Sequence, residues 1–279
     1  MRCICIPNWR NMKEIAFIED VLHEATEYAR AKYQDKVGLH VESKADPNDL
    51  LTEADLTIQR MVVKRIESEF PGDHVAAEES GKNVMPADRN VRCWILDPID
   101  GTQNFVRGIF PLFGISLGFT QQGYLHAGGV SLPMLDQYLL AEKGSGATRN
   151  GARLQVSKVA EARVARVEID FSISEHRQKT LDRFSPLICN TGQVRCLCSA
   201  VVSLCSIATG DLDAYVHVGL SPWDYAASQL LLEEAGGKAT RLDGAELNVF
   251  DAKRGMLATN GLLHEEYLSM LRKTESTPQ

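Results

Sequence analysis

Hydrophobic residues repeat at helical spacing in two stretches near the start of the chain. The first series is Ile15, Ile18, Val21, Leu22, Ala25 and Ala29, and the second is Ile58, Met61, Val62 and Ile66. Residues three and four positions apart lie on one face of a helix. Each stretch therefore predicts an amphipathic helix with one buried face.

From Phe113 onward the hydrophobic pattern changes to that of strands. Three short apolar or alternating runs, at 113–120, 124–132 and 137–141, are separated by Gln-Gln-Gly and by Pro-Met-Leu-Asp. Short strands separated by such turn residues are typical of an antiparallel meander. We therefore expect an α+β first half.

The second half of the chain alternates between strand and helix patterns. Strands are predicted near 163–169 and 212–216, and helices near 199–209 and from 222. A strand-helix pattern is predicted again from Gly237 and Met256. This pattern predicts a more α/β second half. Turn residues at Gly144-Ser-Gly and Asn150-Gly151 place the division near residue 150, which gives halves of 1–150 and 151–279.

Length and charge restrict the class of protein. The chain has 279 residues, of which 44% are hydrophobic, so it can bury a substantial core. Its net charge of −7 argues against a nucleic-acid-binding surface, which needs a basic stripe. No apolar run approaches the roughly 18 residues of a membrane span, and the start is too short for a signal peptide. We expect a cytoplasmic protein that begins at Met1, or at Met12 if the leading residues are a tail.

The cysteines form an odd and unevenly spread set without a CxxC pair, at positions 3, 5, 93, 189, 196, 198 and 205. This usage indicates a reduced compartment. Cys3-Ile4-Cys5 and Cys196-Leu197-Cys198 each offer two thiolates to zinc, but neither has a neighbouring histidine. We interpret both pairs as small buried hydrophobic residues.

The stretch Trp94–Phe105, WILDPIDGTQNF, carries the most chemical information. An apolar run ends in Asp97 and Asp100 and continues into a Gly-Thr turn. Carboxylates suit Mg²⁺, and the N–H groups of a turn leading into a helix suit phosphate. The proline after Asp97 bends the chain, so that both carboxylates and the carbonyl of Ile99 can converge. By itself the stretch also fits an Asx-rich turn after a buried strand.

Two further acidic groups lie elsewhere in the chain. Glu78-Glu79-Ser80 follows the apolar run Val75-Ala76-Ala77, and Trp223-Asp224 opens an apolar helix. A magnesium site needs carboxylates from several segments. Three acidic motifs in one chain therefore favour a metal site over a single turn.

Taken together, the motifs EES, DPIDGT and WDYAA resemble those of the inositol monophosphatase family. These are magnesium-dependent, often lithium-sensitive phosphatases related to fructose-1,6-bisphosphatase. The resemblance extends from about Lys44 to Asn260, through Lys44 with Asn48–Asp55, Asn150-Gly151 with Leu154–Ser157, and Glu234–Gly237. It implies a layered αβαβα sandwich of the sugar-phosphatase type, an active site between the halves, and a homodimer.

The resemblance also implies the metal ligands. One Mg²⁺ would be held by Glu78, Asp97 and the carbonyl of Ile99, and a second by Asp97, Asp100 and Asp224. Asp97 would bridge the two ions. A third, weaker Mg²⁺ near Glu78 is a further implication of the family.

Other residues receive supporting roles from the same resemblance. Thr102 and Asp55 would orient the attacking water, and the N–H groups of Gly101 and Thr102 would hold the phosphate. Lys44 would place a cation beside the metal-bound waters. Glu79 is expected to support the site without binding metal, because neighbouring carboxylates usually point in different directions.

Two of these acidic residues also have a purely structural interpretation. Ser221-Pro222-Trp223-Asp224 has serine at the N-cap, proline at N1 and an acid at N3 of a helix, and Thr52-Glu53-Ala54-Asp55 has the same form. Either aspartate could be a capping-box carboxylate. Capping and ligation are compatible.

Other catalytic motifs find little support. Gly114–Gly118 matches GxSxG, but the strand alternation continues through Phe119 and Thr120, whereas a nucleophile elbow needs a strand-to-helix turn. The glycine-rich segment 144–151 lacks GK[ST] and is predicted to be a hairpin turn. The seven histidines include no HExxH, so zinc hydrolysis is not indicated.

Two positions depart from the animal inositol-specific pattern. Gln103 stands where that pattern has a second threonine, and His217 stands where it has a glutamate expected to bind inositol hydroxyls. Asn104–Ile109 resembles the bacterial histidinol-phosphate phosphatases of the family. We expect a small phosphorylated polyol or sugar as substrate: inositol 1-phosphate first, with histidinol phosphate and fructose 1,6-bisphosphate as alternatives. A regulatory protein that binds the transcription machinery is the alternative from another class.

Overall fold

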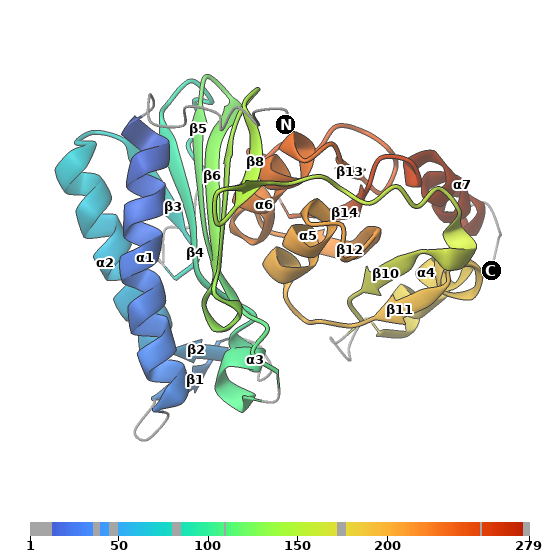
Figure 1. The fold of residues 1–279 in the computed structure, drawn as a ribbon, viewed down its shortest axis with the longest axis horizontal. Coiled ribbons are helices and arrows are strands. Elements are labelled where there is room, and N and C mark those ends of the chain that lie inside the picture. Colours follow the sequence, from blue (N-terminus) through green and yellow to red (C-terminus); the bar gives the residue numbers. More distant parts are fainter. Residues whose placement is uncertain are drawn as a thin grey trace, which may run out of the picture.

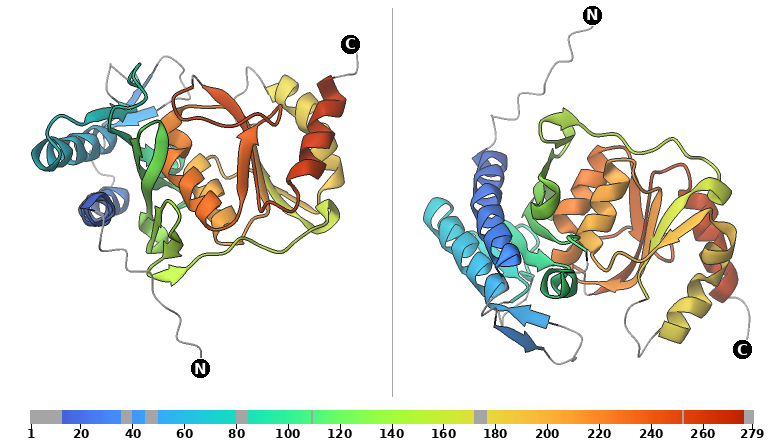
Figure 2. Two further views of the ribbon diagram at one scale, coloured as in Figure 1. Left: turned by 90° about the horizontal axis from the view of Figure 1, so that it is seen from above. Right: turned by 60° about the horizontal axis from the view of Figure 1, so that its bottom comes forward.

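The protein forms five layers, in the order helices, sheet, helices, sheet, helices (Figure 1). The computed structural model describes residues 13–35, 40–44, 50–79, 85–108, 110–171, 177–251 and 253–275. Figure 2 shows the same layers from two other directions. The predicted αβαβα sandwich is confirmed.

The outer helical layer on the N-terminal side consists of α1 (Lys13–Gln34) and α2 (Glu53–Glu69). These are the two helices predicted from hydrophobic spacing. A hairpin of β1 (Val41–Ser43) and β2 (Leu50–Thr52) lies between them in the chain. Its second strand runs directly into α2.

The first sheet has seven strands in sequential order. They are β3 (His74–Ala77), β4 (Cys93–Asp100), β5 (Gly114–Gln121), β6 (Tyr124–Leu132), β7 (Gln137–Glu142), β8 (Gly146–Arg149) and β9 (Ala152–Arg153). Strand β3 is parallel to β4, and every later pair is antiparallel, as the predicted meander requires. Ser116 lies inside β5, so GxSxG forms no nucleophile elbow. A short 3₁₀ helix, η2 (Pro133–Leu135), joins β6 to β7.

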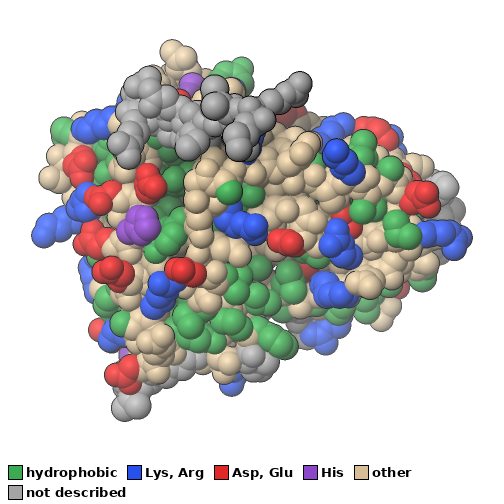
Figure 3. All heavy atoms as spheres, in the orientation of Figure 1, with side chains coloured by type: hydrophobic (Ala, Val, Ile, Leu, Met, Phe, Trp, Pro, Cys, Tyr) green, Lys and Arg blue, Asp and Glu red, His purple; other side chains and the backbone are tan. Residues whose placement is uncertain are grey.

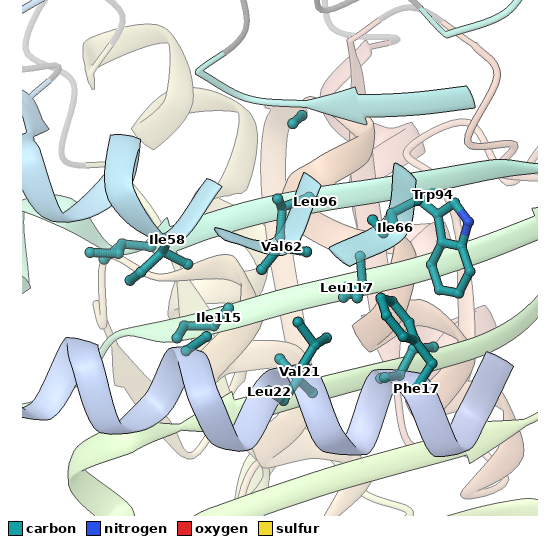
Figure 4. Packing of buried hydrophobic residues seen from close by; sticks show 14 of the residues in the cluster. Phe17, Val21, Leu22, Ile58, Val62, Ile66, Trp94, Leu96, Ile115 and Leu117 are labelled. Atoms are coloured by element: carbon teal, nitrogen blue, oxygen red, sulfur yellow. The ribbon is translucent and has the colours of Figure 1, made fainter. Parts of the chain in front are cut away.

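Trp94 of β4 is the largest side chain buried between the outer helices and the first sheet (Figure 4). Its ring lies 5.1, 4.9 and 4.7 Å from the rings of Phe17, Phe70 and Phe119. The indole Nε1 donates to Oδ2 of Asp73 over 2.9 Å, so burial leaves no unpaired donor on this ring. The core on this side thus combines aromatic packing with one satisfied polar group.

Helices α5 (Ala200–Ala208) and α6 (Pro222–Glu234) form the middle layer. Helix α6 is buried along most of its length, as expected for a helix between two sheets. A Cβ at Gly128 of β6 would lie 3.0 Å from both the Cα and the carbonyl oxygen of Ala227. The missing side chain lets α6 approach the first sheet closely, and this contact fixes the helix that carries Asp224.

The second sheet is mixed and has the strand order β11-β10-β12-β14-β13. Its strands are β10 (Arg166–Ile169), β11 (Gln193–Arg195), β12 (Ala214–Leu220), β13 (Lys238–Arg241) and β14 (Arg254–Thr259). Strand β10 is parallel to both neighbours and β14 is antiparallel to both. The 3₁₀ helix η3 (Ala162–Val164) takes up the start of the predicted strand, so β10 begins later than expected. The division into halves near residue 150 stays a prediction.

Helices α4 (Arg177–Asn190) and α7 (His264–Glu275) cover the far side of the second sheet. The hydrophobic pattern did not predict α4. Its buried residues are only Thr180, Phe184 and Leu187, and Pro186 lies inside it. So few apolar positions give a weak helical signal, and tertiary packing supplies the rest.

On the face shown in Figure 3, basic and acidic side chains are interspersed across the described residues. Within the described ranges, no helix has both the length and the apolar character needed to cross a membrane.

Candidate active site

The two aspartates of the central motif lie at the end of β4, where the strand is irregular. Asp97 pairs with Ser116 and Asp100 with Gly114, and the register shifts between these pairs. The main-chain N–H of Ile99 donates to Oδ1 of Asp97 over 3.0 Å. Asp97, Ile99 and Asp100 line one cleft, so the bend expected from the proline brings these three residues to one surface.

The turn after β4 leads into the short helix α3 (Thr102–Arg107). Gly101 has φ of +85°, and a Cβ there would lie 3.0 Å from the carbonyl oxygen of Leu112 and 3.1 Å from Cβ of Ser199. Both the left-handed backbone and the close approach therefore require glycine. Thr102 follows at once, and its hydroxyl donates to the carbonyl oxygen of Ile99 over 2.9 Å.

Asp55 caps its own helix and also faces Thr102. Its Oδ2 accepts the main-chain N–H of Thr52 over 2.9 Å and the hydroxyl of the same residue over 2.5 Å. Its Oδ1 lies 3.4 Å from the hydroxyl of Thr102. Burial raises the pKa of Asp55 to about 6, although the hydrogen bonds from Thr52 oppose the shift. Thr52 and Asp55 therefore form a capping box. The other carboxylate oxygen of Asp55 lies beside the hydroxyl of Thr102, which is predicted to orient the water.

Lys44 joins the two glutamates that follow β3. Its Nζ lies 2.7 Å from Oε1 of Glu78 and 2.7 Å from Oε1 of Glu79. Burial and the charge of Glu78 raise the pKa of Glu79 to about 7. Burial lowers the pKa of Lys44, but the two carboxylates outweigh this effect and raise it.

This arrangement corrects one expectation about the neighbouring carboxylates. Glu78 and Glu79 do not diverge, because the chain turns after β3 and both side chains reach the same ammonium group. The main-chain N–H of Glu79 also donates to Oε1 of Gln59 over 2.9 Å, which ties this turn to α2. Glu78 lines the cleft.

Asp224 enters the cleft from the middle layer. Its Oδ2 accepts the main-chain N–H of Ser221 over 2.7 Å, so it does cap α6. Burial raises the pKa of Asp224 well above its usual range, and the charges of Glu78 and Asp100 raise it further. Asp224 thus caps α6 and also lies near the other carboxylates of the cleft. The sequence had left both roles open.

Asp100 connects β4 to helix α5. Its Oδ2 accepts hydrogen bonds from the hydroxyl of Ser199 and, over 3.1 Å, from the main-chain N–H of Val201. Burial raises the pKa of Asp100 to about 7 despite these bonds, which favour the charged form. Burial likewise raises the pKa of Asp97, and the charge of Glu78 adds to the effect.

These carboxylates form a buried cluster whose members repel one another. Such repulsion is relieved when a divalent cation binds between them. The donors facing the cleft are carboxylate and carbonyl oxygens, which suit Mg²⁺ better than they suit softer metals. The donor set therefore fits the metal that the motifs predict.

The cleft has a volume of about 500 Å³ and a second wall built from the C-terminal sheet. His217 of β12 lines this wall, and its Nδ1 accepts the main-chain N–H of Gly219 over 3.0 Å. Its Nε2 lies 4.0 Å from Oδ2 of Asp170. Burial lowers the pKa of His217, so the neutral imidazole is favoured.

Most of the predicted site residues meet in this cleft. Those that line it are Glu78, Asp97, Ile99, Asp100, Gly101, Thr102, Gln103, His217 and Asp224. Three more lie outside the cleft lining: Lys44 contacts Glu78, Glu79 contacts Lys44, and Asp55 lies beside Thr102. The matching residues Asn48-Asp49 and Ser80, together with Cys3, Cys5 and Met12, lie outside the described residues.

Several cleft residues were not predicted. They are Leu50, Asn104, Arg107, Asp170, Cys198, Ser199, Ala200, Tyr215, Gly219, Leu220 and Lys253. Of these, Cys198 belongs to the closely spaced thiol pair, and Leu50, Asn104 and Arg107 lie in segments that resemble the family, although no role was predicted for them. The others belong to no acidic or glycine-rich motif, so only their position identifies them.

The interpretation of Cys196 and Cys198 as buried hydrophobic residues is wrong. Cys196 is exposed and Cys198 is half-buried. Strand β11 ends at Arg195, and Cys198 has φ of +56° where the chain turns toward α5. The two side chains therefore lie on a loop at the edge of the cleft.

Comparisons with known proteins agree with this architecture. The sequence model of the inositol monophosphatase family matches residues 11–276. A fructose-1,6-bisphosphatase/inositol-1-monophosphatase of Thermotoga maritima is 36% identical over 84% of this chain and 87% of its own length. An inositol-1-monophosphatase of Bacillus subtilis is 34% identical over 94% of this chain and 98% of its own. The solved structure of the Thermotoga maritima IMPase superposes with a TM-score of 0.83 at 32% identity, covering 95% of this chain and 98% of that one.

Similar proteins carry more than one functional name. A histidinol-phosphatase of Mycobacterium tuberculosis is 35% identical over 88% of this chain and 93% of its own length. The Nus factor SuhB of Vibrio cholerae is 33% identical over 71% of this chain and 73% of its own.

Proposed function

The chain belongs to the inositol monophosphatase family and is a phosphoric monoester hydrolase, and from this premise we propose that it is a Mg²⁺-dependent phosphatase of inositol 1-phosphate and related small phosphate monoesters. The observation that carries this proposal is the cluster of Asp97, Asp100 and Asp224 in one cleft. The negative charges of these carboxylates repel one another, and their oxygen atoms are the ligands that a hard divalent cation prefers.

Two ions would share these ligands. Glu78, Asp97 and the carbonyl of Ile99 would hold one, and Asp97, Asp100 and Asp224 the other, with a third, weaker site near Glu78. When bound, Mg²⁺ supplies positive charge that offsets the charge of the phosphate and favours ionisation of water. Lys44 holds the Oε1 atom of Glu78 in place, and Glu79 in turn holds Lys44.

Thr102 and Asp55 are proposed to orient the attacking water. The Thr102 hydroxyl directs its proton to the carbonyl of Ile99, so the lone pairs of its oxygen remain available to accept a hydrogen bond from water. Asp55 Oδ1, 3.4 Å from that hydroxyl, offers a second acceptor beside it. The main-chain N–H groups of Gly101 and Thr102 would hold the phosphate, and the absent side chain of Gly101 permits a close approach.

The second wall of the cleft would select the alcohol part of the substrate. His217 presents hydrogen-bonding groups on this wall, and Gln103 of α3 presents others elsewhere in the cleft. A volume of about 500 Å³ accommodates a sugar- or polyol-sized ligand. Inositol 1-phosphate is the first candidate, and the names of relatives support histidinol phosphate and fructose 1,6-bisphosphate as alternatives. A neutral histidine in place of an acid favours a broader specificity than that of the animal inositol phosphatases.

A phosphate-release panel tests this function. Inositol 1-phosphate, histidinol phosphate, fructose 1,6-bisphosphate, adenosine 3′,5′-bisphosphate and NADP are each assayed with Mg²⁺ and with excess chelator. We expect Mg²⁺-dependent release from several compounds, with the highest kcat/KM for inositol 1-phosphate. Preference for another compound by ~10³-fold would replace the proposed substrate, and full activity in chelator would contradict the metal requirement.

A regulatory role in transcription is the second candidate, because one relative carries the name of a Nus factor. Pull-down with wild type and with Asp97→Asn separates the two functions. A binding role should survive loss of the metal ligand, whereas catalysis should not. Homodimer formation and a cytoplasmic location stay predictions, and size-exclusion chromatography with light scattering measures the former.

A further inference from the structure

A second cluster of metal-ligating side chains lies on the substrate wall of the cleft. Sγ of Cys196 is 3.7 Å from Sγ of Cys198. A carboxylate oxygen of Asp170 lies within 4.8 Å of both sulfur atoms. Asp170 and Cys198 line the same cleft as the carboxylate cluster.

The sulfur separation matches the geometry of a tetrahedral metal. Two sulfurs that each lie about 2.3 Å from one Zn²⁺ are roughly 3.8 Å apart. Residues 196 and 198 are separated by one residue, and the main-chain N–H of Leu197 between them donates to Oε1 of Glu168 over 3.1 Å. This bond holds the loop in the conformation that places both thiols together.

A buried carboxylate behind the loop gives an independent indication of a cation. Glu168 is fully buried, and its Oε2 has no hydrogen-bond partner among the described residues. Burying an unpaired carboxyl oxygen is costly, and a cation bound near it would reduce that cost.

We propose that Cys196, Cys198 and Asp170 bind a thiophilic divalent cation such as Zn²⁺ at the substrate edge of the active-site cleft. Binding releases the protons of the two thiols. Three protein ligands leave a fourth position open to water or another small ligand. His217 does not supply it in this orientation, because its Nδ1 accepts the N–H of Gly219 and its remaining nitrogen therefore carries the proton.

The two metal sites in the cleft differ in ligand chemistry. The carboxylate cluster offers only oxygen, which suits Mg²⁺, whereas two thiolates select softer metals. Zn²⁺ can therefore bind the thiol site in the presence of excess Mg²⁺. A cation at this position occupies the wall that faces the alcohol part of the substrate, so it should raise KM more than it lowers kcat.

Cobalt absorption tests the site without any substrate. The Mg²⁺-loaded full chain, kept reduced by a phosphine, is titrated with Co²⁺, which gives a thiolate-to-cobalt charge-transfer band in the near ultraviolet. We expect the band in wild type, its loss on addition of Zn²⁺, and its absence in Cys196→Ser. Cys189→Ser is the matched control, since Cys189 is an exposed cysteine of α4 outside the cluster, and it should keep the band.

Inhibition gives the second measurement. Zn²⁺ should raise the KM of wild type and of Cys189→Ser, and Cys196→Ser should need ~10- to 100-fold more Zn²⁺ for the same effect. Absence of the band in wild type, or an equal band in Cys196→Ser, overturns the proposal. Equal Zn²⁺ sensitivity of both variants also overturns it, because Zn²⁺ would then act at the carboxylates. The absorption result holds whichever phosphate ester is the substrate.

Discussion

The hydroxyl of Thr102 donates to the carbonyl oxygen of Ile99 over 2.9 Å. This bond spans the turn between β4 and α3 and fixes the hydroxyl at the wall of the cleft. Oδ1 of Asp55, a residue of α2, lies 3.4 Å from the hydroxyl oxygen of Thr102. A water between them would be oriented by groups that two separate segments hold in place.

Removal of this hydroxyl should therefore lower kcat without releasing metal. Thr102→Ala should reduce kcat by ~10²-fold or more, because the attacking water loses its alignment. Thr102→Ser keeps the hydroxyl and is the control. Steady-state kinetics and calorimetric Mg²⁺ titration measure both effects. Equal activity of the two variants would show that Thr102 does not orient the water.

Loss of the bridging carboxylate should abolish catalysis but leave the fold intact. Asp97→Asn should lower kcat/KM by at least ~10³-fold, about 4 kcal/mol of transition-state stabilisation. Without metal, the variant should be at least as stable as wild type, because repulsion and burial already raise the pKa of Asp97. Phosphate release and urea unfolding measure the two properties. Glu265→Gln, on the surface of α7, is the control, and unchanged activity of Asp97→Asn would exclude the two-metal arrangement.

Asp224 tests whether a capping residue also binds metal. Asp224→Asn keeps an oxygen that can accept the N–H of Ser221, so the melting temperature should change little. The Mg²⁺ concentration for half-maximal activity should rise, since the ligand loses its charge. Calorimetry and thermal unfolding together decide the matter. Normal Mg²⁺ affinity with a lower melting temperature would make Asp224 a cap alone.

His217 should influence the choice of substrate. His217→Glu places a carboxylate on the substrate wall, where it can accept hydrogen bonds from neighbouring hydroxyls. Relative kcat/KM should shift toward inositol 1-phosphate by roughly 1–3 kcal/mol. The phosphate-release panel is repeated on this variant and on His126→Glu, which lies outside the cleft. An unchanged rank order would show that residue 217 does not contact the substrate.

Acid sensitivity of the fold should depend on His264. Its two ring nitrogens contact the hydroxyls of Thr240 and Thr259 at 3.0 Å each, and burial lowers its pKa to about 4. The unfolded chain binds this proton nearer pH 6.5, so the stability from neutral His264 is complete above pH 6.5 and is lost toward pH 4.

The pH slope of unfolding measures this contribution. The free energy of unfolding should fall by up to about 3 kcal/mol from this residue between pH 6.5 and 4. The buried carboxylates have the opposite effect on the free energy of unfolding. Their pKa values are raised in the folded protein, so they stabilise it as the pH falls. The comparison is therefore between wild type, His264→Gln and the exposed control His40→Gln at fixed Mg²⁺ concentration. Equal slopes in all three proteins would contradict the assignment to His264.

Local sequence determined the helices and strands that have a clear hydrophobic period, and the segments that contain a distinct motif. Hydrophobic spacing predicted α1 and α2, and alternation predicted the meander that contains β5 and its serine. The acidic motifs predicted Asp97, Asp100 and Asp224 as site residues, and the three residues line one cleft. Carboxylates beside turns and helix starts have a limited set of uses. These features depend on neighbours within a few residues, so the chain itself displays them.

Tertiary structure decided which of those residues meet. Lys44 holds both Glu78 and Glu79 only because the hairpin before α2 lies beside the turn after β3. The thiols of Cys196 and Cys198 lie near Asp170 because β11 ends at Arg195 and the chain turns at Cys198, whose backbone is left-handed. Contacts between distant segments depend on how helices and sheets pack, and one sequence contains no direct signal for that packing. The sequence thus specified which types of side chain are present, and the packing of the layers decided which of them lie together.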